Sequence, residues 1–133
     1  MLQGINHITI AVSDLARSIY FYQKQLGMTL KAQWPSGAYL CLAGQWICLS
    51  LDDVCPSKDY SHIAFDIAKE DFQPFCDQLV AQDVALWKQN KSEGQSLYLL
   101  DPDGYKLEIH VGDLASRLQA MKAAGKEGVV FYE

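Results

Sequence analysis

The sequence contains no run of basic residues and no long apolar stretch. Its 11 basic and 16 acidic side chains give a net charge of −5. A chain without a positive patch has nothing to attract a phosphate backbone, which argues against nucleic acid as a partner. No segment approaches the ~20 apolar residues that cross a bilayer, and the N-terminus lacks the basic-then-apolar pattern of an export signal. We therefore expect a cytoplasmic protein without a membrane partner.

A Cys-x-x-Cys pair, the spacing typical of zinc and redox motifs, is also missing among the four cysteines. A chain of 133 residues with 50% hydrophobic content suits one globular domain that buries roughly 65–70% of its unfolded surface and needs no disulfides. We expect reduced thiols that act as small core hydrophobes. These are Cys41, Cys48, Cys55 and Cys76.

One pattern occurs twice. Residues 6–12 (NHITIAV) align with residues 61–67 (SHIAFDI), so His7 and His62 occupy equivalent positions. Each copy continues with a stretch of helical periodicity and then three short strands, the order βαβββ. The expected helices are 14–26, 69–79 and a final 113–124. The expected later strands are 29–33, 38–42 and 46–51 in the first copy and 84–89, 95–100 and 106–111 in the second, followed by a short tail at 129–132.

The repeat predicts an α+β fold built from two tandem βαβββ modules within one domain. The modules span about residues 1–52 and 59–112, joined by a polar linker. One module leaves a sheet face bare, whereas two facing modules can curve a mixed sheet around a shared cleft. Residues 101–104 (DPDG) predict a tight turn before the last strand, because Pro presets φ and Gly tolerates the return of the chain.

The repeat also changes how its two histidines are interpreted. A single histidine at a strand end commonly bonds a backbone carbonyl and nothing more, but chance does not place two in register. Glu108 lies in the middle of the last strand. Two imidazoles and a carboxylate form a mixed N/O set suited to Mn²⁺, Fe²⁺, Co²⁺, Ni²⁺ or Zn²⁺, with coordination positions left open. We predict a divalent metal site formed by His7, His62 and Glu108.

Alternation in the last strand indicates which of its side chains face the cleft. Lys106, Glu108 and His110 fall on one face, and apolar residues fill the other. The apolar face suits contact with the helices, which directs Glu108 into the cleft. His110 shares the face of Glu108 and is the alternative ligand.

The loop 88–96 has no counterpart in the first copy and is rich in hydroxyls, amides and lysine. Its simpler interpretation is a solvated hairpin loop. Its functional interpretation is an ion site, where Lys88 and hydroxyls hold a phosphate-like anion and turned carbonyls hold a monovalent cation. Arg117, on the final helix, is a further candidate for the anion. Four strand residues can face inward, the aromatic ones having core packing as their alternative role: Thr9, Tyr39, Trp46 and Tyr98.

Several motifs together resemble the vicinal oxygen chelate superfamily. They are His7-x-Thr9, the helix end Phe21-Tyr22…Leu26-Gly27, Tyr60-Ser61-His62, residues 87–94 (WKQNKSEG), and the DPDG turn followed by Leu107-Glu108. Within it, nearly the whole chain is similar to the fosfomycin resistance glutathione transferases, the FosA class. The turn with its following Glu is shared across the superfamily, whereas the WKQNKSEG run is specific to this class.

The resemblance implies a metal-dependent, domain-swapped homodimer that adds glutathione to the epoxide of fosfomycin and so inactivates the antibiotic. His7, His62 and Glu108 match the ligands of Mn²⁺ or another divalent metal, with His7 coming from one subunit and the other two from its partner. The nucleophile is the thiolate of the cosubstrate, so the site needs no catalytic triad. None is visible in the sequence.

The same resemblance implies roles for the other candidates. Thr9 and Tyr39 match catalytic positions, with Tyr39 and Cys48 at the side where the thiol enters, and Trp46 resembles the wall beside the methyl carbon of the substrate. The positions that bind the phosphonate match Thr9, Lys88, Ser92, Tyr98 and Arg117. The loop that holds an activating K⁺ ion matches Asn90, Ser92, Glu93, Gly94 and Ser96.

Single positions separate the related reactions. Relatives that use other thiols carry Cys where Thr9 stands, and hydrolytic relatives carry Glu on the hairpin 39–50, which has no carboxylate here. Both differences favour glutathione. The alternatives are a thiol transferase with a different thiol, a dioxygenase, an isomerase, or a non-enzymatic drug-binding protein. An isomerase usually has a fourth protein ligand, and the first copy offers only Cys48 at the place equivalent to Glu108.

Three departures from the class pattern concern the thiol site more than the reaction type. Ile63 follows His62 where an aromatic residue is common, and Tyr105 follows the DPDG turn where His is common. The linker 52–59 also differs. These departures bear on the shape of the thiol entry and on catalytic efficiency.

Overall fold

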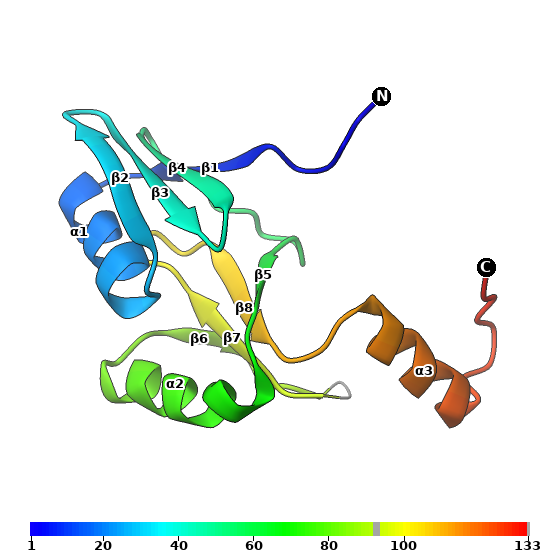
Figure 1. Cartoon of the computed structure of the whole chain (residues 1–133). Coiled ribbons are helices and arrows are strands. Elements are labelled where there is room, and N and C mark those ends of the chain that lie inside the picture. Colours follow the sequence, from blue (N-terminus) through cyan, green and yellow to red (C-terminus); the bar gives the residue numbers. More distant parts are fainter. Residues whose placement is uncertain (92–93, 133) are drawn as a thin grey trace. The chain divides into compact units, whose positions relative to one another are not determined.

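Each copy of the repeat folds into its own four-stranded sheet in the computed structural model, which describes residues 1–91 and 94–132 (Figure 1). Two compact units result: Met1–Ser61 with Leu100–Lys106, and His62–Leu99 with the residues from Leu107 onward. The elements in chain order are β1 (His7–Val12), α1 (Leu15–Ile19), η1 (Tyr20–Gln25), β2 (Thr29–Trp34), β3 (Gly37–Leu42), β4 (Gln45–Leu51), β5 (Ile63–Asp66), α2 (Lys69–Ala81), β6 (Leu86–Lys88), β7 (Ser96–Leu100), β8 (Lys106–His110) and α3 (Leu114–Ala124).

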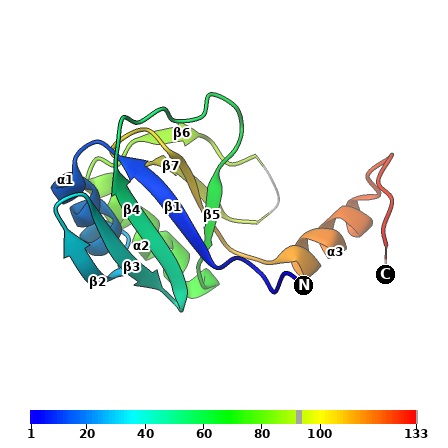
Figure 2. The same ribbon diagram turned by 90° about the horizontal axis from the view of Figure 1, so that it is seen from above.

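The two sheets share one strand order. The first is ordered β1-β4-β3-β2 and the second β5-β8-β7-β6, and in each the first and last strands of the repeat pair in parallel. Figure 2 shows the four strands of the first sheet side by side. The α+β class and the tandem βαβββ repeat are therefore confirmed. The expectation of one curved mixed sheet is wrong, because every ladder joins strands of a single repeat.

The strand registers give the repeat an exact residue correspondence. Thr9 lies opposite Cys48 across β1 and β4. Ala64, which aligns with Thr9 in the repeat, lies opposite Glu108 across β5 and β8. Cys48 therefore occupies the place of Glu108 in the first sheet, as the sequence predicted.

The first sheet buries one face against its helix. Ile10 and Val12 of β1 are at most 1% exposed, while His7 and Thr9, which alternate with them, are exposed. The helix begins at the N-cap Asp14, whose side chain accepts a hydrogen bond from the Arg17 N–H (3.0 Å). This N-cap supplies an acceptor for one of the backbone N–H donors that every helix start leaves unsatisfied.

The expected single helix 14–26 is wrong in its second half, which is the π-helix η1. The Leu26 N–H donates to the Phe21 carbonyl (2.9 Å), and the Met28 N–H donates to the Tyr22 carbonyl. The wider turn accompanies the burial of both Phe21 and Tyr22, which are neighbours in sequence. Gly27 then adopts a φ of 84°, the left-handed conformation expected at the end of this helix.

The second unit differs from expectation in the length of β6. At the end of α2, the Val84 N–H donates to the Leu79 carbonyl (3.2 Å), and Asp83 has a φ of 59°. This turn takes up the first residues of the expected strand 84–89, so β6 spans only Leu86–Lys88. The tail 129–132 forms no strand.

The last helix begins close to where the sequence predicts it. Asp113 and Ser116 form a reciprocal capping box, in which each side chain accepts a hydrogen bond from the backbone N–H of the other. Gly125 ends the helix in the left-handed conformation. Within the described ranges 1–91 and 94–132, no helix has both the length and the apolarity of a membrane-crossing segment.

The DPDG turn before β8 is held by two carboxylates of the first unit. Asp101 accepts hydrogen bonds from the Tyr22 hydroxyl (2.7 Å) and the Tyr105 N–H (2.8 Å). Asp103 accepts hydrogen bonds from Ser13 and forms an ion pair with Arg17 (2.9 Å). Burial raises the pKa of the Asp101 carboxyl above its ordinary value, and burial beside this carboxyl also raises the pKa of the Tyr22 hydroxyl. The Tyr22 hydroxyl therefore stays protonated and donates.

Candidate metal and substrate site

The second unit places His62 beside Glu108. His62 immediately precedes β5, and the parallel β5–β8 ladder sets Ala64 opposite Glu108. The His62 Nε2 atom lies 2.9 Å from Glu108 Oε1. Glu108 is only 7% exposed, and its neighbours Leu107 and Ile109 are buried in the core. The alternation predicted for this strand is confirmed, and it brings a carboxylate and an imidazole together from strands 46 residues apart in sequence.

The second oxygen of Glu108 is also engaged. Oε2 accepts a hydrogen bond from the Ser96 hydroxyl of β7 (2.8 Å). Ser96 Oγ lies 2.6 Å from His110 Nδ1, and that nitrogen lies 3.3 Å from Glu108 Oε2. Ser96 and Glu108 are buried and His110 is half-buried. The carboxylate is therefore satisfied on both sides, which is the condition for burying such a group.

Aromatic rings form a wall beside the imidazole of His62. The ring centroids of Trp87 and Tyr98 lie 5.6 Å and 6.3 Å from that of His62, and the two aromatic rings meet edge to face at 5.2 Å. The Trp87 indole N–H donates to the Leu107 carbonyl (2.9 Å), which fixes the ring. The Lys88 ammonium lies 4.7 Å from the centre of the Tyr98 ring, within the range of a cation–π contact.

The exposed face of the first sheet carries a second group of the predicted residues. His7 lies opposite Trp46 across β1 and β4, with ring centroids 4.4 Å apart. Tyr39 meets Trp46 edge to face at 5.1 Å. Thr9 is exposed on the same face and lies opposite Cys48, which is 8% exposed. The His7 ring also bonds the Asn6 side chain through Nδ1 (2.7 Å), which leaves Nε2 for another partner.

The predicted site residues thus fall into two groups, one in each unit. His62, Lys88, Ser96, Tyr98 and Glu108 lie together in the second unit, and His7, Thr9, Tyr39 and Trp46 lie together in the first. Across residues 1–91 and 94–132, no three His, Cys, Asp or Glu side chains form a group that could hold a metal ion. The three-residue ligand set therefore stays a prediction.

The predicted ion loop is described in part. The Asn90 side-chain amide donates to the Gly94 carbonyl (2.8 Å), which closes the loop on itself. Gly94 has a φ of 77°, so a residue other than glycine would be strained there. Ser92 and Glu93 lie outside the described residues. Arg117 lies on α3 and is half-buried.

The roles of two residues in the site go beyond what the sequence predicts. Trp87 enters the sequence pattern only as the first letter of the WKQNKSEG motif, although an indole next to a candidate anion-binding lysine is itself a signal. The sequence predicts His110 only as an alternative ligand. Its hydrogen bond to Ser96 depends on the register between β7 and β8, which the turn at 101–104 does not by itself determine.

The donor set fits a divalent metal ion. Two atoms bound to one ion at about 2.1 Å and at right angles lie about 3 Å apart, close to the 2.9 Å between His62 Nε2 and Glu108 Oε1. Imidazole and carboxylate suit Mn²⁺, Fe²⁺ or Zn²⁺, and the absence of thiolate argues against a closed structural zinc site. The third residue of the predicted ligand set, His7, lies on the exposed face of the first sheet.

Comparison with known proteins decides the family. The family model of the Glyoxalase/Bleomycin resistance protein/Dioxygenase superfamily matches residues 4–109. The chain belongs to this superfamily. The match contains both copies of the repeat and ends directly after Glu108 and Ile109.

Within the superfamily, the chain is similar to fosfomycin resistance proteins. It is 52% identical over 98% of its length to the glutathione transferase FosA of Serratia marcescens, covering 96% of that protein. It is 37% identical to the metallothiol transferase FosB of Staphylococcus haemolyticus, covering 99% of each chain. The crystal structure of FosX from Listeria monocytogenes, complexed with Mn(II) and a sulfate ion, superimposes with a TM-score of 0.83 at 30% identity and covers 90% of this chain and 98% of that one.

Proposed function

We propose that this chain inactivates fosfomycin by adding the thiol of glutathione to its epoxide. The observation that carries the proposal is the 52% identity, over nearly the full length of both chains, to a glutathione transferase FosA. Two features of this chain support it. Thr9 stands where the resemblance places Cys in users of other thiols, and the β3–β4 hairpin has no carboxylate that could activate water.

The metal of this reaction is Mn²⁺ or another divalent ion, held by His62, Glu108 and the partner subunit's His7. When bound, the ion supplies a Lewis acid that polarises the epoxide oxygen. The pairing of His62 with Glu108 at 2.9 Å and the binding of Mn(II) by the FosX relative support this assignment. Glu108 holds a full negative charge at the site and orients the imidazole of His62.

A doubly charged phosphonate needs cations and donors from a chain whose net charge is −5. Lys88, whose ammonium lies against the ring of the hydroxyl-bearing Tyr98, supplies one such cation. Arg117 and the hydroxyls of Thr9 and Ser92 complete the proposed phosphonate site. Such charge-assisted hydrogen bonds are the strong ones, and they orient the substrate as well as hold it. A K⁺ ion bound by the loop Asn90–Ser96 adds further positive charge and raises activity.

The thiol reaches the epoxide from the side of Tyr39 and Cys48. Tyr39 is 39% exposed and sits against Trp46, so its hydroxyl is available to an incoming thiolate, while Trp46 faces the methyl carbon of fosfomycin. The glutathione thiol gives up its proton to solvent, the new C–S bond forms from the thiolate as the epoxide C–O bond breaks, and the ring oxygen takes up a proton from solvent. No protein nucleophile takes part.

A homodimer with shared sites completes this arrangement. The exposed aromatic face of the first sheet carries His7, Thr9, Tyr39 and Trp46, and the second sheet carries His62 and Glu108. We propose that the first sheet of one subunit meets the second sheet of its partner, and that the enzyme acts in the cytoplasm, where glutathione is available. A fully active monomer would contradict the shared site.

The deciding experiment incubates the purified protein with Mn²⁺, K⁺ and fosfomycin, and offers glutathione, cysteine or water as the nucleophile in parallel samples. ³¹P NMR distinguishes the thiol adduct, the diol and unreacted substrate. We expect the adduct with glutathione at the highest rate. Unmodified fosfomycin in all samples would overturn the proposal, and a faster reaction with cysteine or water would reassign the reaction type.

A further inference from the structure

The two oxygens of Glu108 have different partners. Oε1 lies 2.9 Å from His62 Nε2, on the side where the metal is proposed. Oε2 accepts a hydrogen bond from the Ser96 hydroxyl (2.8 Å) and lies 3.3 Å from His110 Nδ1. Oε1 is therefore available as a metal ligand, and Ser96 and His110 fix the orientation of Oε2.

The direction of the hydrogen bonds follows from counting protons. A serine hydroxyl has one proton, and an ionised carboxylate can only accept. Since the Ser96 proton is donated to Glu108, the Ser96 oxygen must accept the 2.6 Å hydrogen bond from His110 Nδ1–H. The three side chains form one chain of donors, from His110 through Ser96 to Glu108.

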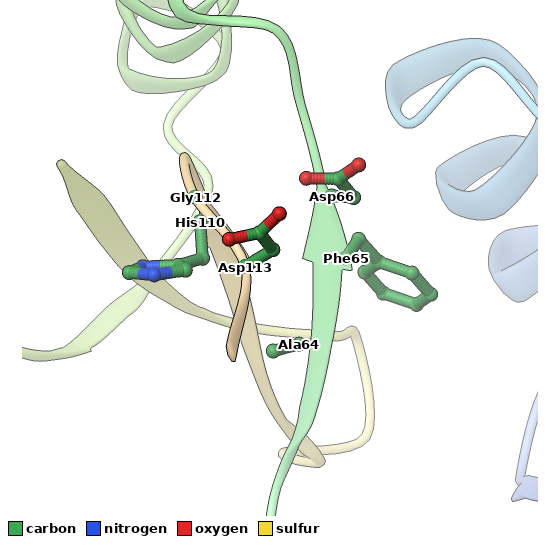
Figure 3. A pocket seen from close by; sticks show the side chains of 6 residues that line it. All are labelled: Ala64, Phe65, Asp66, His110, Gly112 and Asp113. Atoms are coloured by element: carbon green, nitrogen blue, oxygen red, sulfur yellow. The ribbon is translucent and has the colours of Figure 1, made fainter. Parts of the chain in front are cut away.

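This chain of donors lies in a place where water competes poorly. The side chains of Glu108 and His110 are 10% and 18% exposed, and Ser96 is 9% exposed. Removing one donor would leave a carboxylate oxygen of Glu108 buried without a hydrogen bond. Because the surroundings have low polarity, this loss destabilises the arrangement more than it would in water. The other residues near His110 come from β5 and the start of α3, and they line a pocket of about 160 Å³ with it: Ala64, Phe65, Asp66, Gly112 and Asp113 (Figure 3).

We propose that His110 is a positioning residue, which acts through Ser96 to keep Oε1 of Glu108 turned toward His62 and the divalent ion. The inference rests on the proposed metal site. His110 is distinguished from a ligand because, among the described residues, it does not form a three-residue metal-binding group with His62 and Glu108. Outer partners of this kind orient a ligating carboxylate and set the affinity of the site for its metal.

The test measures Mn²⁺ binding by electron paramagnetic resonance of the free ion, in buffer without K⁺ and without substrate. His110→Leu removes the donor, whereas His110→Asn keeps an N–H donor at the position of Nδ1. We expect the Kd for Mn²⁺ to rise about 10-fold or more in His110→Leu, in line with losses of outer partners at other sites. His110→Asn should recover most of the affinity, within about threefold of the original, since it preserves the donor.

The number of imidazole nitrogens bound to Mn²⁺ distinguishes a positioning residue from a ligand. Electron spin echo modulation of bound Mn²⁺ reports the number of coordinated imidazole nitrogens, and this number should be the same in the original protein and both variants. An unchanged Kd in His110→Leu, or the loss of one imidazole signal, would overturn the proposal.

A second variant covers the case in which His110→Leu does not fold. Ser96→Ala removes the middle of the donor chain and should weaken Mn²⁺ binding to a similar degree, so an unchanged Kd in Ser96→Ala would overturn the proposal. Where His110→Leu folds, adding it to Ser96→Ala should cost nothing more, since the two residues act in series. Additive losses would overturn the relay. A protein that binds Mn²⁺ in this manner but leaves fosfomycin unmodified would refute the proposed function and support this inference.

Discussion

Cys48 occupies in the first sheet the place that Glu108 occupies in the second. Both lie opposite the third residue of the repeated pattern, Thr9 in one copy and Ala64 in the other. The two sheets are therefore equivalent in backbone but not in chemistry. One copy contributes an imidazole and a carboxylate to the proposed metal site, and the other contributes only an imidazole. The proposed site therefore has three protein ligands, with coordination positions left for substrate.

Replacing Glu108 with Gln should remove the metal site and keep the fold. The amide has nearly the same shape but no charge, and it can still bond Ser96. We expect Mn²⁺ affinity and the rate of glutathione transfer to fall by more than about 100-fold. This is more than the loss of a residue that only hydrogen-bonds a metal ligand causes. The circular dichroism spectrum should not change. Glu127→Gln, at an exposed position near the C-terminus, is the matched control and should keep full activity. Equal loss in both variants would contradict the assignment.

Replacing Lys88 with Ala should weaken the binding of fosfomycin more than it slows the reaction at saturation. The ammonium lies 4.7 Å from the Tyr98 ring centre and is the proposed contact to the phosphonate. Loss of a charged hydrogen bond is worth about 1.5–3 kcal/mol, so KM should rise by about 10- to 150-fold. Steady-state kinetics at fixed glutathione measures this. Lys126→Ala, at an exposed position, should leave KM unchanged, and an unaltered KM in Lys88→Ala would exclude the contact.

Replacing Tyr22 with Phe should destabilise the protein more at pH 7 than at pH 3.5. Its hydroxyl donates to the buried Asp101 carboxyl, whose pKa is raised above its ordinary value by burial. The donor favours the ionised form, so its removal raises this pKa further. The unfolded chain loses the proton near the ordinary Asp pKa, so the folded state is penalised as the pH rises above that value. We expect a loss of about 1–3 kcal/mol at pH 7 by urea unfolding, and a smaller one at pH 3.5. A loss independent of pH would show that the hydroxyl contributes through packing alone.

Cys76 should resist alkylation in the folded protein. Its thiol is 5% exposed, and burial raises its pKa to about 11, so little of the reactive thiolate exists at pH 8. Iodoacetamide at pH 8 should modify the exposed Cys55 first, and mass spectrometry of peptides should find Cys76 unmodified until the protein unfolds. The unfolded thiol ionises near pH 9, so Cys76 should also lower stability as the pH rises from about 9 to 11. Equal modification of both cysteines would contradict its burial.

The sequence alone determined the fold class and most of the element order. Alternating strands, helical periods and the turn at 101–104 are local signals, because they depend on side-chain spacing and backbone propensity. The repeated histidine then predicted two site residues, and the position of Glu108 in an alternating strand predicted the third.

The local signals failed where backbone hydrogen bonds departed from the regular helix and strand patterns. The π-helix η1 follows from burying Phe21 and Tyr22 together, and the short β6 follows from the hydrogen bond between Val84 and Leu79 that ends α2. Neither event leaves a pattern in the spacing of apolar residues. The same is true of the contact between Ser96 and His110.

Only the tertiary structure decided how the site residues are held. The sequence determined that His62, Glu108 and His110 are present and which strand face each occupies, since the alternation of a strand is fixed by its backbone. It could not determine which oxygen of Glu108 faces His62, or that Ser96 reaches the other, because strand register and side-chain orientation are set only when the sheet forms. The residue types determine what chemistry the site can perform, and hydrogen bonds between strands determine how its side chains are oriented.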